Sequence, residues 1–149
     1  MAKKAKAEFL QLKETYEAKA DSLDSGLKIY YINDRENNKP KTGSVVNVFY
    51  SGYFTTGELF TTNKKEVAEL FLKYDPRFEA RGGYNPKEMD YSPDAELIPG
   101  FKEGLRKMDI GDKVMLFIPS HLGYGETGAG GVIPPNATLI FDVELMEVE

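Results

Sequence analysis

Apolar and polar residues alternate along several short stretches of the chain, and a repeat of two residues is typical of a β-strand with one buried face. In the longest stretch, residues 44–54, Val46, Val48 and Tyr50 fall on one face, and Gly52 predicts a bend or bulge. Together with shorter apolar runs bounded by turn residues, this pattern predicts about five strands, at residues 27–33, 44–54, 58–61, 113–119 and 138–146.

The N-terminal residues 3–20 are mainly types that favour helix, and Phe9, Leu12 and Tyr16 form one narrow apolar stripe at helical spacing. Two interpretations stay open. The helix packs on its own domain or serves as a linker, or it mediates self-association or contact with another domain. We therefore expect an N-terminal helical extension, residues 1–24, joined to a domain that spans residues 25–149.

Residues 62–93 form a long insertion between the predicted hairpin and the next helix. Connections of this length inside a compact domain are usually functional or mobile. A short amphipathic helix, ended by Asp75-Pro76, is predicted at residues 65–74 from four apolar residues at helical spacing, Val67, Leu70, Phe71 and Tyr74. We expect this stripe to pack on the domain, as most do; the alternative is a chaperone-like flap that faces client proteins.

Residues 96–108 predict a central helix with Pro99 in its first turn and Ile98, Phe101 and Leu105 on one face. Mostly antiparallel strands with one helix on a single face make an α+β domain. The predicted fold class is therefore α+β, with an added N-terminal helix and a long insertion that carries a short helix.

The composition excludes several classes of function. A net charge of −5 argues against nucleic acid or an anionic membrane as the main partner. No apolar run approaches the roughly 20 residues of a membrane span, and the chain has no cysteine for disulfides, thiolate chemistry or zinc clusters. The compartment stays open between cytoplasmic and, if the chain is a fragment of an exported protein, periplasmic.

A glycine-rich loop begins at Gly123 and continues into an apolar segment that ends in Pro134-Pro135. Its first residues, 123–128, match the GxGxxG pattern of dinucleotide-binding proteins, but that fingerprint requires a helix directly afterwards, which the following glycines and prolines prevent. We predict no nucleotide site. A rigid apolar loop that carries Tyr124 instead indicates the wall of a pocket for a small molecule or a peptide.

Side chains for acid–base, nucleophilic or metal chemistry are scarce. His121 is the single histidine, no serine occupies a nucleophile elbow, and Asp90, Asp94 and Glu96 lack the spacing of a calcium loop. We therefore predict no cofactor and no metal ion.

What the chain does offer is a set of aromatic and aliphatic residues from well-separated segments, several beside turns and loops: Tyr50, Phe60, Ile98, Phe101, Tyr124, Ile133 and Phe141. They form either an ordinary core or the lining of a concave site. Rotation about an X-Pro bond is one reaction that suits an apolar cleft without acid, base or metal.

Three segments, residues 48–60, 96–119 and 124–145, closely resemble the FKBP-type peptidyl-prolyl cis-trans isomerases, and residues 25–32 resemble the first strand of that family. The resemblance implies a twisted antiparallel sheet wrapped around one short helix. It also implies isomerase activity that assists protein folding, and a pocket between helix and sheet that binds proline-containing polypeptides and macrolides such as rapamycin.

Residue by residue, the resemblance implies catalytic positions at Tyr50, Phe60, Ile98, Phe101, Tyr124 and Phe141, and substrate-binding positions at Leu97, Val132, Ile133 and Thr61. It implies that the Ile98 N–H and the Tyr124 hydroxyl donate hydrogen bonds to ligand carbonyls. Phe101 takes the floor position, which is often tryptophan in the family.

Two departures from the family pattern matter. Thr61 stands where the family usually has aspartate, which predicts reduced macrolide affinity. The long insertion leaves the family's arginine and aromatic of this region without a defined counterpart, with five candidates, Arg77, Phe78, Arg81, Met89 and Tyr91. These departures leave open an alternative function, a weakly catalytic, chaperone-like module that binds proline-containing or unfolded polypeptide.

Overall fold

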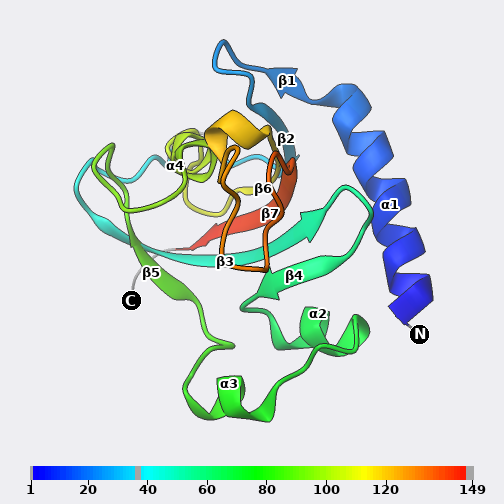
Figure 1. Cartoon of the computed structure of the whole chain (residues 1–149). Helices are drawn as coiled ribbons and strands as arrows, with labels where there is room; N and C mark the ends of the chain where they lie inside the picture. Colours follow the sequence, from blue (N-terminus) through cyan, green and yellow to red (C-terminus); the bar gives the residue numbers. More distant parts are fainter. Residues whose placement is uncertain (1, 36–37, 147–149) are drawn as a thin grey trace.

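Seven strands form one curved sheet in which every neighbouring pair runs antiparallel (Figure 1). The computed structural model describes residues 2–35 and 38–146, so the first residue of the predicted extension and the last three of the predicted domain lie outside it. The strand order is β1-β2-β6-β7-β3-β4, and β5 also pairs with β3. The strands are β1 (Asp21–Ser22), β2 (Lys28–Asn33), β3 (Val45–Phe54), β4 (Leu59–Thr62), β5 (Lys87–Asp90), β6 (Lys113–Ile118) and β7 (Leu139–Met146).

The helices lie on both faces of this sheet. The described residues form α1 (Ala2–Lys19), α2 (Lys65–Leu70), α3 (Pro76–Ala80), α4 (Pro99–Leu105) and a 3₁₀ turn, Ser120–Leu122. The short helix α4 lies against the concave side, and the long helix α1 runs along the opposite side (Figure 1). This arrangement confirms the predicted α+β class and the central helix.

Successive side chains of β7 point alternately to the two faces of the sheet and so belong to two different apolar clusters. Leu139, Phe141 and Val143 belong to the apolar cluster on the α4 side, whereas Ile140 belongs to the cluster beneath α1. A strand buried on both faces reads as a nearly continuous apolar run, which is why residues 138–146 were recognisable in the sequence.

The prediction of about five strands is wrong by two. The missed β1 has two residues, and the missed β5 has the sequence KEMD, in which Met89 alone is buried. Strands this short and polar carry no periodicity to detect.

The insertion also differs from its prediction. The helix ends at Leu70 and not at Tyr74, because Leu72 adopts a left-handed conformation with φ of 57°. Asp75-Pro76, predicted to end this helix, instead begins α3: the Asp75 carboxylate accepts a 2.9 Å hydrogen bond from the Arg77 N–H, and Pro76 takes the first helical position.

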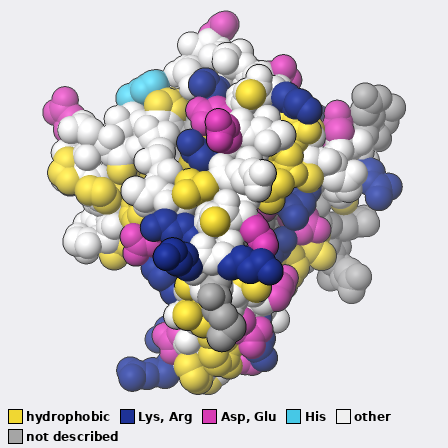
Figure 2. Space-filling view, turned by 90° about the vertical axis from the view of Figure 1, so that its right-hand side faces the viewer, with side chains coloured by type: hydrophobic (Ala, Val, Ile, Leu, Met, Phe, Trp, Pro, Cys, Tyr) yellow, Lys and Arg dark blue, Asp and Glu magenta, His cyan; other side chains and the backbone are white. Residues whose placement is uncertain are grey.

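The apolar stripe of the insertion is divided between the domain and the surface. Val67 and Phe71 pack on the domain, as predicted, against the cluster that contains Phe9 and Tyr53, but Leu70 and Tyr74 are 61% and 37% exposed. Figure 2 looks onto the side of the molecule that carries α1, where side chains of both charge signs are scattered over the surface and hydrophobic side chains gather at the lower end.

Helix α1 packs on the sheet of its own chain. Phe9 stacks on Tyr53 with ring centroids 3.8 Å apart, and Tyr16 stacks on Tyr30 at 4.5 Å. The predicted stripe is wrong at Leu12, which is 48% exposed, and Leu10 packs against the cluster in its place.

Candidate active site

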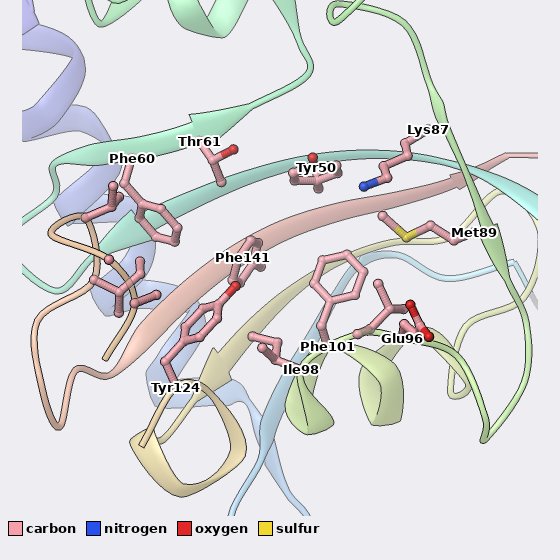
Figure 3. Close-up of a pocket in the computed structure, with 15 residues that line it drawn as sticks. Tyr50, Phe60, Thr61, Lys87, Met89, Glu96, Ile98, Phe101, Tyr124 and Phe141 are labelled. Carbon is pink, nitrogen blue, oxygen red and sulfur yellow. The ribbon is translucent and has the colours of Figure 1, made fainter. Parts of the chain in front are cut away.

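A cleft of about 740 Å³ opens between α4, the concave face of the sheet and the glycine-rich loop that carries Tyr124 (Figure 3). Its walls come from segments far apart in the sequence: β3, β4, β5, the start of α4, the glycine-rich loop and β7. The structure brings all the residues predicted for the site to this one cleft: Tyr50, Phe60, Thr61, Leu97, Ile98, Phe101, Tyr124, Val132, Ile133 and Phe141.

Phe141 is the centre of the aromatic lining. The centroid of its ring lies 5.2 Å from that of Phe101 and 5.7 Å from that of Phe60, and both of these rings are nearly perpendicular to it. The Tyr50 ring centroid is 6.4 Å away. Tyr50 and Phe101 also meet edge to face, 6.0 Å apart. Edge-to-face contacts of this kind hold rings at fixed angles, so the cleft has a preformed apolar floor and walls.

The contact between Phe141 and Phe60 depends on Gly52 of β3. A Cβ atom at this position would lie 2.8 Å from both the Phe141 and the Phe60 ring, closer than side chains pack. The pairing of β3 with β4 shifts register between Gly52 and Tyr53, which is the predicted bulge. Gly52 therefore lets the two rings converge over β3 from the strands on either side of it, β4 and β7.

The glycine-rich loop is folded back on itself, and the chain continues from it into β7 without a helix, as its glycines and prolines predict. Ala129 and Ile133 exchange two backbone hydrogen bonds of 2.9 Å. At Gly128, φ is +69°, and a Cβ atom would lie 2.3 Å from the Ile133 carbonyl oxygen. The fold buries Ile133 against the cleft and leaves Val132 59% exposed at its rim.

Two hydrogen-bond donors belong to residues that line this apolar space, Tyr124 and Ile98. The Tyr124 side chain, 41% exposed, directs its hydroxyl into the cleft (Figure 3). Ile98 is the residue before the first turn of α4, where backbone N–H groups have no helical partner. Within the described part of the chain, neither the Tyr124 hydroxyl nor the Ile98 N–H donates to another group, so both are available to a ligand.

Asn63 connects the cleft to the insertion. Between the residues paired with β4 and those paired with β5, the outer edge of β3 has a gap, which the Asn63 side chain fills. Its oxygen accepts from the Tyr50 N–H at 2.8 Å, and its amide donates to the Val48 carbonyl at 2.9 Å and the Asn85 carbonyl at 3.2 Å. Asn63 is 3% exposed and thereby fixes the backbone of a cleft residue. Sequence reasoning did not identify it.

The insertion contributes β5 to the cleft, and with it Lys87 and Met89. Met89 was one candidate from this region, but the other four lie elsewhere. Phe78 of α3 packs on Tyr84 at 4.9 Å, and the buried Tyr91 donates its hydroxyl to the Arg106 carbonyl at 2.9 Å. Neither Arg77 nor Arg81, the two arginine candidates, lines the cleft.

Further lining residues that sequence reasoning did not place here are Lys87, Glu96, Ala129 and Gly130. Glu96 comes directly before the predicted site residues Leu97 and Ile98, so its place in the sequence already indicates a position near the cleft. Lys87 was not, because its strand was not recognised.

The electrostatics of the cleft are nearly neutral. Burial raises the pKa of the Tyr50 hydroxyl above its ordinary value, an effect that the Thr61 side chain partly offsets. Tyr50 therefore stays protonated at physiological pH. Among the described residues, two charged side chains, Lys87 and Glu96, border the cleft.

Of the side chains considered for acid–base and metal chemistry in the sequence, Glu96 lines the cleft, whereas Asp90 and Asp94 do not. His121 lies outside the cleft lining, and its Nε2 is 2.8 Å from the Ser25 carbonyl oxygen. Over residues 2–35 and 38–146, no three metal-binding side chains come together. The site can bind a compact apolar group and hydrogen-bond to carbonyls on either side of it.

Comparison with known proteins agrees with this geometry. A sequence model of the FKBP-type peptidyl-prolyl cis-trans isomerase family matches residues 36–146. FK506-binding protein 1 of Dictyostelium discoideum is 36% identical over 121 residues, which cover 81% of this chain and 96% of that protein. The FKBP-type 22 kDa peptidyl-prolyl cis-trans isomerase of Escherichia coli is 38% identical over 128 residues, 86% of this chain and 52% of that protein.

Among solved structures, FkpA from Escherichia coli aligns with a TM-score of 0.67 and 30% identity, covering 97% of this chain and 57% of that chain. The chain thus spans little more than half the length of these two bacterial relatives. None of the helices in the described residues is long and apolar enough to cross a bilayer.

Proposed function

Because the chain belongs to the FKBP-type peptidyl-prolyl cis-trans isomerase family, we propose that it accelerates rotation about X-Pro bonds and does so in the cleft between α4 and the sheet. The observation that carries this proposal is the convergence of Tyr50, Phe101 and Phe141, from three separate elements, around one open hollow. Proteins that refold through slow proline steps are the substrates that this activity serves.

The physical task is to lower a rotational barrier. Rotation about the imide bond breaks amide resonance and costs about 20 kcal/mol. In the twisted transition state the carbonyl and nitrogen are no longer conjugated, so the group is less polar than the planar imide and gains less from water. An apolar cleft therefore stabilises the twisted form relative to the planar one, which is differential binding of the transition state.

In this mechanism the aromatic rings bind the proline ring. Phe101 forms the floor at 4% exposure, and Phe141 and Tyr50 form the adjacent walls. The Tyr124 hydroxyl and the Ile98 N–H donate hydrogen bonds to the carbonyls that flank the proline, and so hold the substrate in a turned conformation. A hydrogen bond of this kind contributes about 1 kcal/mol net, so no single donor is indispensable.

The Dictyostelium relative is named for binding FK506, a macrolide. Such macrolides would occupy the same apolar cleft in this chain. Thr61 lines the cleft where the family usually has a carboxylate, so one charged contact to such a ligand is missing. We expect macrolide binding to be weaker than in family members with aspartate at this position. Thr61→Asp should strengthen inhibition, and equal inhibition of both proteins would contradict this role.

A protease-free isomerisation assay tests the function. The protein should accelerate the cis-to-trans conversion of an X-Pro peptide, and Phe101→Ala should reduce kcat/KM by about tenfold or more, because it removes the floor of the cleft. Lys28→Gln, on the far side of the sheet, is the control that keeps full activity. A wild-type rate equal to that of buffer would end the proposal.

A further inference from the structure

Lys87 carries an ammonium group at the edge of a largely apolar site, and the strand pairing sets the direction of its side chain. β5 pairs with β3 so that Lys87 lies opposite Val48 and Met89 lies opposite Val46. Side chains directly opposite each other in an antiparallel pair share a face, and both valines are buried on the cleft side. Lys87 and Met89 must therefore face the cleft, and Figure 3 shows the Lys87 amino group pointing into it beside Tyr50.

No partner within the described chain neutralises this charge. Lys64, Lys65 and Lys73, in the same region, each form an ion pair, but Lys87 forms none with any described residue. Glu96 borders the same end of the cleft (Figure 3), yet its carboxylate makes no ion pair with Lys87. The ammonium group is thus directed at the space that a substrate would occupy.

We propose that Lys87 is a specificity-determining residue, which favours substrates with an acidic side chain next to the proline. The inference rests on the proposed function, because the proline ring fixes the substrate against Phe101 and Phe141. Even a fully extended chain advances at most about 3.3–3.6 Å per residue, and a turned substrate advances less, so a residue adjacent to the proline lies within reach of a lysine side chain on the neighbouring wall.

The preference must be local, because the molecule as a whole works against it. The chain carries a net charge of −5, which repels acidic peptides at long range. The apolar surroundings of Tyr50 and Met89 reduce the screening of a charge pair formed beside them. We expect a pair at this partly open site to change kcat/KM by about three- to fivefold, the upper range for exposed ion pairs.

The test uses three peptides that differ in the residue before proline, Glu, Gln or Lys, and measures kcat/KM for each in the protease-free assay. For the wild type, the Glu peptide should exceed the Lys peptide by about three- to fivefold at low salt, and the difference should vanish near 1 M salt, where the screening length is about 3 Å. Lys87→Gln should bring the ratio to one or below, because Glu96 and the net negative charge then favour the Lys peptide, and Lys87→Glu should lower the ratio further.

Lys41→Gln is the matched control, because it removes the same charge from an exposed loop position outside the cleft. It should keep the wild-type ratio. A ratio that Lys87→Gln leaves unchanged would overturn the proposal. The same variant would then show whether Lys87 merely prevents association through the edge of the sheet, since aggregation would rise with no change in preference. Failure to accelerate any of the peptides would instead overturn the proposed function, and the role of Lys87 with it.

Discussion

The two faces of the sheet carry similar aromatic side chains, yet a long helix covers one face, whereas the other face borders an open cleft. On the α1 side, an 18-residue helix covers the strands, and Phe9 stacks on Tyr53 at 3.8 Å. On the α4 side, a helix of seven residues covers part of the face, and the rings around Phe141 border a cleft of about 740 Å³. Helix α1 thus covers its face along the strands, whereas α4 covers only part of a face that also holds most of the buried core, and the uncovered part of that face borders the cleft.

This comparison predicts that substitutions on the two faces separate stability from activity. Phe9→Ala should lower the free energy of unfolding by about 3 kcal/mol, because it removes a buried ring and leaves a cavity beneath α1. Below the unfolding transition its kcat/KM should stay within twofold of the wild type, since Phe9 lies on the face away from the cleft. Chemical denaturation and the isomerisation assay measure the two quantities.

Substitution of Asn63 should lower stability and activity together, because Asn63 supports the backbone of the cleft. Asn63→Ala leaves the Tyr50 N–H and the Val48 carbonyl without their partner, so we expect a loss of about 2 kcal/mol in unfolding free energy. Unlike Phe9→Ala, it should also lower activity, since the backbone of Tyr50 loses its anchor. Wild-type activity in the folded variant would show that Tyr50 is held by other contacts.

Asp142 lies on the face covered by α1, and its Oδ1 atom is buried without a hydrogen-bond partner in the described residues. Burial raises the pKa of this carboxyl above its usual value, although Lys113 and Lys64 partly oppose the shift. A raised pKa in the folded state means that the stability contributed by this group is greatest below its ordinary pKa and is lost as pH rises through the folded value.

Asp142→Asn should therefore stabilise the protein by about 1 kcal/mol at pH 7 and by less near pH 4. Unfolding curves at the two pH values check this. A variant that is less stable than the wild type at pH 7 would show that the ionised carboxylate is well compensated, chiefly by Lys113, whose Nζ lies 4.0 Å away.

Tyr124→Phe should have the smallest effect, a decrease of about fivefold in kcat/KM, which is the worth of one modest hydrogen bond. The unfolding free energy should not change, because the hydroxyl faces the cleft and holds no described neighbour. A thousandfold decrease would contradict a mechanism in which donors orient the substrate and the apolar surroundings lower the barrier.

The sequence predicts correctly those helices, strands and loops that depend on local residue patterns. β3, β6 and β7 were predictable from apolar runs, α1 and α4 from composition, apolar spacing and Pro99, and the shape of the 123–135 loop from its glycines and prolines. The aromatic lining followed from the family resemblance, since no local rule makes Phe60 and Phe141 neighbours.

What stayed out of reach depends on tertiary pairing. β5 is recognisable as a strand because it pairs with β3, and Lys87 enters the cleft for the same reason. In the sequence Asn63 resembles an ordinary turn residue, because its role depends on the gap in the edge of β3, which only the folded structure shows. Leu72, a residue type that rarely adopts positive φ, ends α2 where the periodicity of the sequence continues it.

The central claim is that an apolar cleft, without proton transfer, accelerates rotation about the X-Pro bond. The most direct test is the dependence of kcat/KM on pH for a neutral X-Pro peptide in the protease-free assay. Since burial raises the pKa of Tyr50 and His121 lies outside the cleft, we predict a flat profile between about pH 6 and 8. A bell-shaped profile in this range would reveal an essential acid or base and contradict the account.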